Sequence, residues 1–179
     1  MRPVVTFLLF LCFVVTSGCG YTTSSLLPPE LDSIYVANFA NKIDIGAQVS
    51  NRRVDYTYRP GLENDITRAV IDQFIFDRAL DVKRQDEATL SLKGELTSFR
   101  QFPIIYNTDD DVEAYRIEIL VNMELYNNLK GELMWRETSF MGQTEYTVEG
   151  PNAKTEPEAI QDAVKDLAKR IVERTIEAW

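Results

Sequence analysis

Residues 89–99 read TLSLKGELTSF, and apolar and polar side chains alternate along this stretch. Successive side chains of an extended strand point to opposite faces, so Leu90, Leu92 and Leu96 share one face with Gly94 while the polar residues share the other. Residues 115–126, YRIEILVNMELY, repeat the pattern. Both stretches therefore predict strands with one buried face and one face in water.

The neighbouring segments extend this sheet. The turn-forming residues NNLKG at 127–131 lead into a further strand at 132–146, which predicts an antiparallel hairpin. Residues 33–39, SIYVANF, predict another strand because they are rich in β-forming side chains. Residues 41–59 show no clear period and stay unassigned, as a loop or an irregular hairpin. We interpret 101–107, QFPIIYN, as an apolar connection between strands that caps the core or meets a partner.

Two amphipathic helices are expected on this sheet. Pro60 and Glu63 suit the first turn of a helix at 61–79, in which Leu62, Ile66, Val70 and Phe74 share a face. The residues TEPE at 155–158 fit a capping box that begins the last helix. The order of elements predicts one α+β domain at 33–179, with two helices packed on one face of a mainly antiparallel four- to five-stranded sheet.

The first 18 residues have the features of a secretory signal. Arg2 precedes an apolar run at 4–15, which is shorter than the roughly 20 residues of a membrane-spanning helix, and small residues follow. We expect residues 1–18 to be removed as a lipoprotein signal peptide, which leaves 19–32 as a lipidated cysteine and tether.

Cys19 is then the first residue of the mature chain. The other cysteine, Cys12, is lost with the signal and the chain has no histidine, so neither a disulfide nor a closed metal site is available. Thr16 to Cys19, TSGC, resembles a bacterial lipobox, although Leu is usual at Thr16. We predict lipidation of Cys19; an ordinary signal peptide with an idle thiol is the alternative. Gly20, where inner-membrane lipoproteins often carry Asp, favours the outer membrane.

The composition argues against most catalytic and nucleic-acid-binding functions. The net charge is −9 and no glycine-rich phosphate loop is present, so nucleic-acid binding is not expected. Without histidine, the usual nucleophile–imidazole pairs are excluded. Asp109 to Asp111 with Glu113 predict a solvated loop, with a loose calcium site or a carboxylate hydrolase as alternatives. We predict no enzyme activity, no metal site and no cofactor besides the lipid on Cys19.

Clustered cations would be the natural ligands for lipid phosphates. Arg100, Lys130 and Lys154 lie at predicted strand ends or loops, and Lys93 and Arg116 lie on the open face of the sheet. The first three are our candidates for binding phosphate groups of a lipid headgroup.

The order of these features resembles the LptE family of lipopolysaccharide-assembly lipoproteins. The resemblance covers almost all of the mature chain. It rests on Cys19-Gly20-Tyr21, IYVANFAN at 34–41, PGLE at 60–63 with Thr67, LKGEL at 92–96, Tyr115-Arg116-Ile117, and Trp135.

The resemblance implies a lipid-anchored protein on the periplasmic face of the outer membrane, inside a β-barrel partner, LptD, whose assembly it supports. It also implies contact with lipopolysaccharide, for which Arg100, Lys130 and Lys154 are the candidate residues. Asp109 to Asp111 depart from what a phosphate contact would prefer, unless divalent ions bridge the charges. A periplasm-facing scaffold lipoprotein that binds another envelope protein is the alternative function.

Overall fold

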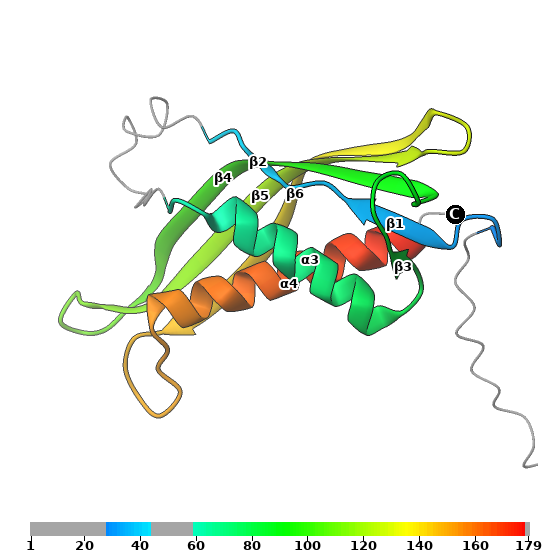
Figure 1. Cartoon of the computed structure of the whole chain (residues 1–179). Coiled ribbons are helices and arrows are strands. Elements are labelled where there is room, and N and C mark those ends of the chain that lie inside the picture. The colour runs from blue at the N-terminus through cyan, green and yellow to red at the C-terminus, as the bar shows by residue number, and fades with distance from the viewer. Residues whose placement is uncertain (1–27, 44–58, 178–179) are drawn as a thin grey trace, which may run out of the picture.

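The computed structural model describes residues 28–43 and 59–177. The elements are β1 Ser33–Val36, β2 Ala40–Asn41, α3 Leu62–Asp77, β3 Asp81–Val82, β4 Leu90–Tyr106, β5 Val112–Asn127, β6 Glu132–Thr147 and α4 Glu156–Glu177. Helices α3 and α4 lie against one face of a sheet built around the long strands β4, β5 and β6 (Figure 1). Within the described ranges, no helix is both long and apolar enough to cross a bilayer.

The sheet is mixed, with antiparallel pairing between the long strands and short parallel additions. Its strand order is β3-β1-β4-β5-β6, and β2 also pairs with β4, so it has six strands where four or five were expected. The β4–β5 and β5–β6 pairs are antiparallel, whereas β1, β2 and β3 are added in parallel. The α+β class, the two helices on one face and the hairpin around residues 127–131 are confirmed.

The apolar faces read from the sequence form the core. Ile66, Val70 and Phe74 of α3 are completely buried, as are Leu167 and Ile171 of α4. They pack on a continuous layer of buried strand residues that includes Leu90, Leu92, Leu96, Ile117, Ile119, Val121, Met123 and Leu125. Helix α4 approaches β6 closely at Gly142, where an added Cβ would lie 2.4 Å from the Cβ of Leu167.

Strand β4 continues through the segment expected to be a connection. Residues 101–107 were predicted to leave the sheet, but Pro103 pairs with Tyr115 and Tyr106 pairs with Val112. Register shifts between Leu96 and Ser98 and again after Pro103 interrupt the period of two, so the alternation fades while the strand itself continues. The prediction of a connection was therefore wrong, and the turn lies at 107–111.

The helix ends follow from local chemistry. Gly61 adopts a φ of 93° immediately before α3, a conformation that glycine reaches without a Cβ penalty. Before α4, the carboxylate of Glu158 accepts hydrogen bonds from the backbone N–H of Thr155 at 2.8 Å and from its hydroxyl at 2.7 Å. The glutamate thus reaches back as predicted, while the hydroxyl donates to it.

The molecule has two distinct ends, seen at the right and left of Figure 1. We call the right end the tether end: it holds Pro28, where the described chain begins, and the β5–β6 turn. The left end, here the far end, holds the β4–β5 turn and the loop between β6 and α4. Both helices run from the far end to the tether end. The predicted signal peptide, Cys19 and residues 44–58 lie outside the described residues.

Candidate functional site

The face of the long strands that points away from the helices carries charges that pair with one another. Arg100 on β4 lies opposite Glu118 on β5, with 2.9 Å between Nη2 and Oε2. Arg116 donates from Nε to Glu145 of β6 at 2.9 Å, and its guanidinium lies 5.8 Å from the ring centre of Phe102. These are cross-strand neighbours, so the sheet register itself brings the opposite charges together.

A second cluster on this open face surrounds Glu124. Its carboxylate accepts hydrogen bonds from the hydroxyl of Tyr126 at 2.6 Å and from Nε of Arg136 at 2.7 Å. The Tyr126 bond first, and then Arg136, hold the pKa of Glu124 below its ordinary value. The same bond raises the pKa of Tyr126. The Nζ atom of Lys93 lies 4.7 Å from the centre of the Tyr126 ring, so the ammonium group also interacts with this cluster.

The three cations proposed for lipid phosphates are not brought together. Arg100 lies along β4 and is held by Glu118, and Lys154 lies at the far end, where its Nζ is 2.7 Å from Asp162. Lys130 lies in the β5–β6 turn at the tether end. The rise of about 3.3 Å per strand residue puts Lys130 on the order of 40 Å from Lys154, so one headgroup cannot bind both.

The acidic stretch forms the β4–β5 turn at the far end. The side-chain oxygen of Asn107 accepts hydrogen bonds from the backbone N–H groups of Asp109 and Asp111, each at 2.9 Å. The three aspartates are exposed. In the part of the chain that the structure describes, no group of three or more acidic, His or Cys side chains is arranged to hold a metal ion. The turn is thus organised by Asn107 within the loop.

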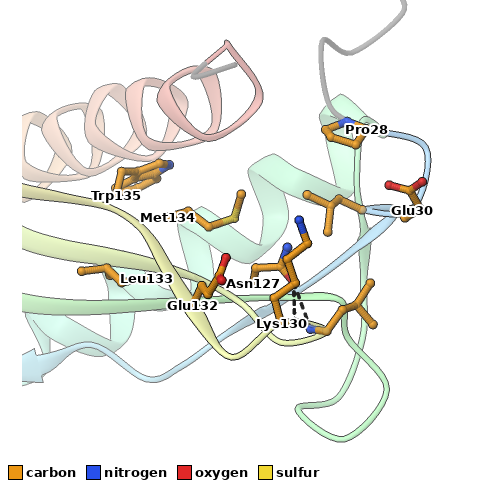
Figure 2. Close-up of a pocket in the computed structure, with 10 residues that line it drawn as sticks. Pro28, Glu30, Asn127, Lys130, Glu132, Leu133, Met134 and Trp135 are labelled. Carbon is orange, nitrogen blue, oxygen red and sulfur yellow. Dashed lines mark hydrogen bonds between the residues drawn. The ribbon is translucent and has the colours of Figure 1, made fainter.

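A pocket of about 540 Å³ opens at the tether end. Figure 2 shows it between the chain before β1 and the start of β6. Its lining combines apolar and charged side chains: Pro28, Glu30, Leu31, Asn127, Leu129, Lys130, Glu132, Leu133, Met134 and Trp135. Asn127 shapes the rim, since its side-chain oxygen accepts the backbone N–H groups of Leu129 and Lys130.

Trp135 connects this pocket to α4. The guanidinium of Arg174 lies 4.9 Å from the Trp135 ring centre, and its Nε is 2.7 Å from Glu137. The indole N–H is buried and has no hydrogen-bond partner within the described residues. Arg174 of α4 therefore contacts the indole ring of Trp135, which also forms part of the pocket wall.

Large exposed apolar side chains gather at both ends of the molecule. Leu129 is 63% exposed and Leu133 is 43% exposed at the tether end, where α3 also ends with the exposed Ile75 and Phe76. Ile105, Tyr106 and Val148 are the exposed large apolar residues around the far end. The pocket could not be predicted from the sequence, because residues near 30 and near 130 meet only through the sheet.

A known family model matches most of this chain. The family model LptE, described as lipopolysaccharide-assembly, matches residues 31–175. The chain belongs to the LptE family. The match spans nearly all of the described domain, including the core residue Leu31 at one end and α4 at the other. The predicted family is confirmed, and with it the assignment to lipopolysaccharide assembly. No curated protein matches the chain.

Solved structures resemble this LptE-family chain at low sequence identity. A hypothetical protein from Chlamydia trachomatis is 8% identical, with 80% of this chain and 95% of that chain covered and a TM-score of 0.51. The rare lipoprotein B from Shewanella oneidensis is 13% identical, with coverages of 80% and 92% and a TM-score of 0.43. Lipoprotein B from Nitrosomonas europaea is 9% identical, with coverages of 89% and 90% and a TM-score of 0.49.

Proposed function

We propose that this LptE-family protein is an outer-membrane lipoprotein, anchored through Cys19 on the periplasmic face. It plugs and assists the assembly of the LptD β-barrel, and it helps insert lipopolysaccharide into the outer leaflet by binding rather than by catalysis. The observation that carries the proposal is the family match over residues 31–175.

The shape of the sheet supports a plug. Strands β4, β5 and β6 have 17, 16 and 16 residues, which corresponds to a length of roughly 50 Å. Such strands are longer than the hydrocarbon core of a bilayer, which is about 30 Å thick. The sheet is thus long enough to occupy a barrel over its full membrane depth.

The chemistry of the open face supports the same role. The lumen of an outer-membrane barrel is polar, and some barrels are filled by a plug. The open face is polar too, and Arg100, Arg116 and Arg136 are each paired with a carboxylate of a neighbouring strand. A face neutralised in this way can enter a polar lumen without leaving an isolated charge uncompensated.

Contact with lipopolysaccharide is constrained by the positions of the cations. Arg100 and Lys154 would have to exchange Glu118 and Asp162 for a phosphate, and Lys130 lies at the opposite end from Lys154. We therefore propose separate lipopolysaccharide contacts at Arg100 and at Lys154, instead of one headgroup site that also includes Lys130. Divalent ions would be needed for contact through Asp109 to Asp111.

Depletion in the native bacterium tests the function. We expect loss of the protein to block surface display of lipopolysaccharide and a plasmid copy of the full chain to restore it. Replacing Asp109, Asp110 and Asp111 with Asn should also restore display, because binding rather than carboxylate catalysis is proposed. Normal display after depletion would contradict the proposal and favour the scaffold lipoprotein that binds another envelope protein.

A further inference from the structure

We propose that the tether-end pocket binds the headgroup region of a phospholipid in the leaflet that holds the anchor, and that it selects an ethanolamine headgroup. This inference rests on the lipidation of Cys19 in the proposed function. The occupant follows from three observations: the position of the pocket along the chain, its apolar rim, and its mixture of charges.

Chain length limits how far the pocket can lie from the anchored residue. Pro28 and Leu31 line it, and Pro28 is nine residues from Cys19. Nine residues span at most about 32 Å in any conformation. The far end lies roughly 50 Å further along the sheet. The tether end is therefore the part of the domain that a lipid on Cys19 holds within reach of the leaflet.

Apolar side chains are exposed at the rim of the pocket. Leu129 and Leu133 are large, exposed and on the pocket wall, and Met134 and Trp135 continue the lining. Exposed apolar residues beside a hollow are typical of an interaction site. The volume of about 540 Å³ suits a headgroup with its glycerol, so the acyl chains would stay in the leaflet beside the two leucines.

The charges in the pocket match a zwitterion. Glu30, Glu132 and Lys130 line it, and none of them has an ion-pair partner among the described residues. An ethanolamine headgroup has an ammonium for the carboxylates and a phosphate for the lysine, which gives charge-assisted hydrogen bonds on both sides.

Anionic headgroups fit these charges less well. A phosphatidylglycerol headgroup offers no ammonium, so the two carboxylates of the pocket would have no cationic partner on it. Lipopolysaccharide, with its phosphate groups, meets an excess of negative charge there. The pocket thus differs from a general anion site.

Trp135 provides an internal probe of occupancy. The chain has two tryptophans, so Trp179→Phe leaves Trp135 as the only indole. The full lipidated chain with this change is placed in nanodiscs of phosphatidylethanolamine brominated on the acyl carbons nearest the glycerol. We expect bromination to reduce Trp135 emission at least twofold. Leu129→Asp with Leu133→Asp should restore the emission, whereas Ile105→Asp, an exposed residue at the far end, should leave the quenching unchanged.

Comparison of two brominated lipids tests the preference for an ethanolamine headgroup. Quenching should be at least threefold weaker in brominated phosphatidylglycerol, and Glu30→Gln with Glu132→Gln should remove this preference. Glu149→Gln, at an exposed far-end glutamate, is the matched control. Equal quenching by both lipids, or relief of quenching by added lipopolysaccharide, would overturn the assignment to an ethanolamine phospholipid.

The experiment distinguishes a wrong pocket proposal from a wrong prediction of lipidation at Cys19. Mass measurement of the purified protein reports the lipid on Cys19, and co-elution with the nanodisc reports insertion. A lipidated, inserted protein whose Trp135 is not quenched overturns the pocket proposal and leaves the proposed function standing. A chain without lipid on Cys19 overturns both. Circular dichroism verifies that each variant is folded.

Discussion

The ring of Phe39 lies directly on the backbone of Gly94: a Cβ added at residue 94 would be 2.1 Å from Cε1 of that ring. Phe39 is itself buried, and its backbone N–H donates to the hydroxyl of Thr67 at 2.9 Å. Three segments that carry the family resemblance, at 34–41, at Thr67 and at 92–96, therefore meet at one point. Their shared role here is structural, since they dock α3 and the first strands on β4.

Gly94→Ala should be destabilising. Because Phe39 is enclosed, the added methyl group forces a shift in a packed core, and we expect the free energy of unfolding to fall by about 1–3 kcal/mol. Urea denaturation measures the change. Lys93→Ala, whose side chain is on the exposed face, should cost much less.

A smaller partner should relieve this clash. In the double variant Gly94→Ala with Phe39→Leu, the loss should be less than the sum of the two single losses, because the ring is absent. Simple additivity would show that the contact between residues 39 and 94 does not determine the packing.

Tyr146→Phe should destabilise through a buried hydrogen bond. The Tyr146 hydroxyl accepts from Nε2 of Gln101 at 2.7 Å, and both residues are buried. Removing the hydroxyl leaves the amide unsatisfied, which costs about 1–3 kcal/mol. Tyr115, whose ring stacks on Tyr146 at 5.7 Å, provides the control variant Tyr115→Phe. Equal losses for both variants in urea denaturation would contradict this explanation.

Arg100 and Glu118 should be energetically coupled. Glu118 keeps only 14% side-chain exposure, so replacing Arg100 with Ala leaves a mostly buried carboxylate without its partner. A double-mutant cycle with Arg100→Ala and Glu118→Ala should give a coupling of about 1 kcal/mol. A coupling near zero would mean that Arg100 is free to bind a lipid phosphate without first losing this bond.

Glu124 should contribute a pH-dependent part of the stability. Its pKa is lowered in the folded protein, so its contribution is present above the ordinary value of 4.5 and is lost as the pH falls through the folded pKa. The unfolding free energies of the native chain and Glu124→Gln should differ most near neutral pH and converge under acid. In a Tyr126→Phe background the difference at neutral pH should be smaller, because the hydrogen bond that lowers the pKa of Glu124 most is absent. A stability difference that grows on acidification would contradict the lowered pKa of Glu124.

Much of the fold could be predicted because the signals were local. The alternation at 89–99 and 115–126, the turn at 127–131 and the apolar faces of both helices are properties of short segments, and all of them are confirmed. The strand at 101–106 was missed because bulges break the alternation there. The parallel pairing of β1, which was expected as a strand at 33–39, was also missed. Strands β2 and β3 were missed because two-residue strands such as Asp81–Val82 leave no periodic signal.

The candidate site was harder to predict than the fold. Arg100, Lys130 and Lys154 were chosen as cations near strand ends, but their mutual distances and their carboxylate partners depend on the sheet register. The tether-end pocket brings Pro28 and Leu31 to the β5–β6 turn, a contact between distant segments that no spacing rule contains.

The proposed function is tested most directly by identifying what the protein binds in the outer membrane. The tagged full chain, with Cys19 intact, is purified in mild detergent and its partners are identified by mass spectrometry. We expect a large β-barrel in stoichiometric amount, and a Cys19→Ala chain should show how far its recovery depends on the anchor. Another envelope protein in place of the barrel would contradict the account of a barrel plug, while the family, the fold and the packing described here would stand.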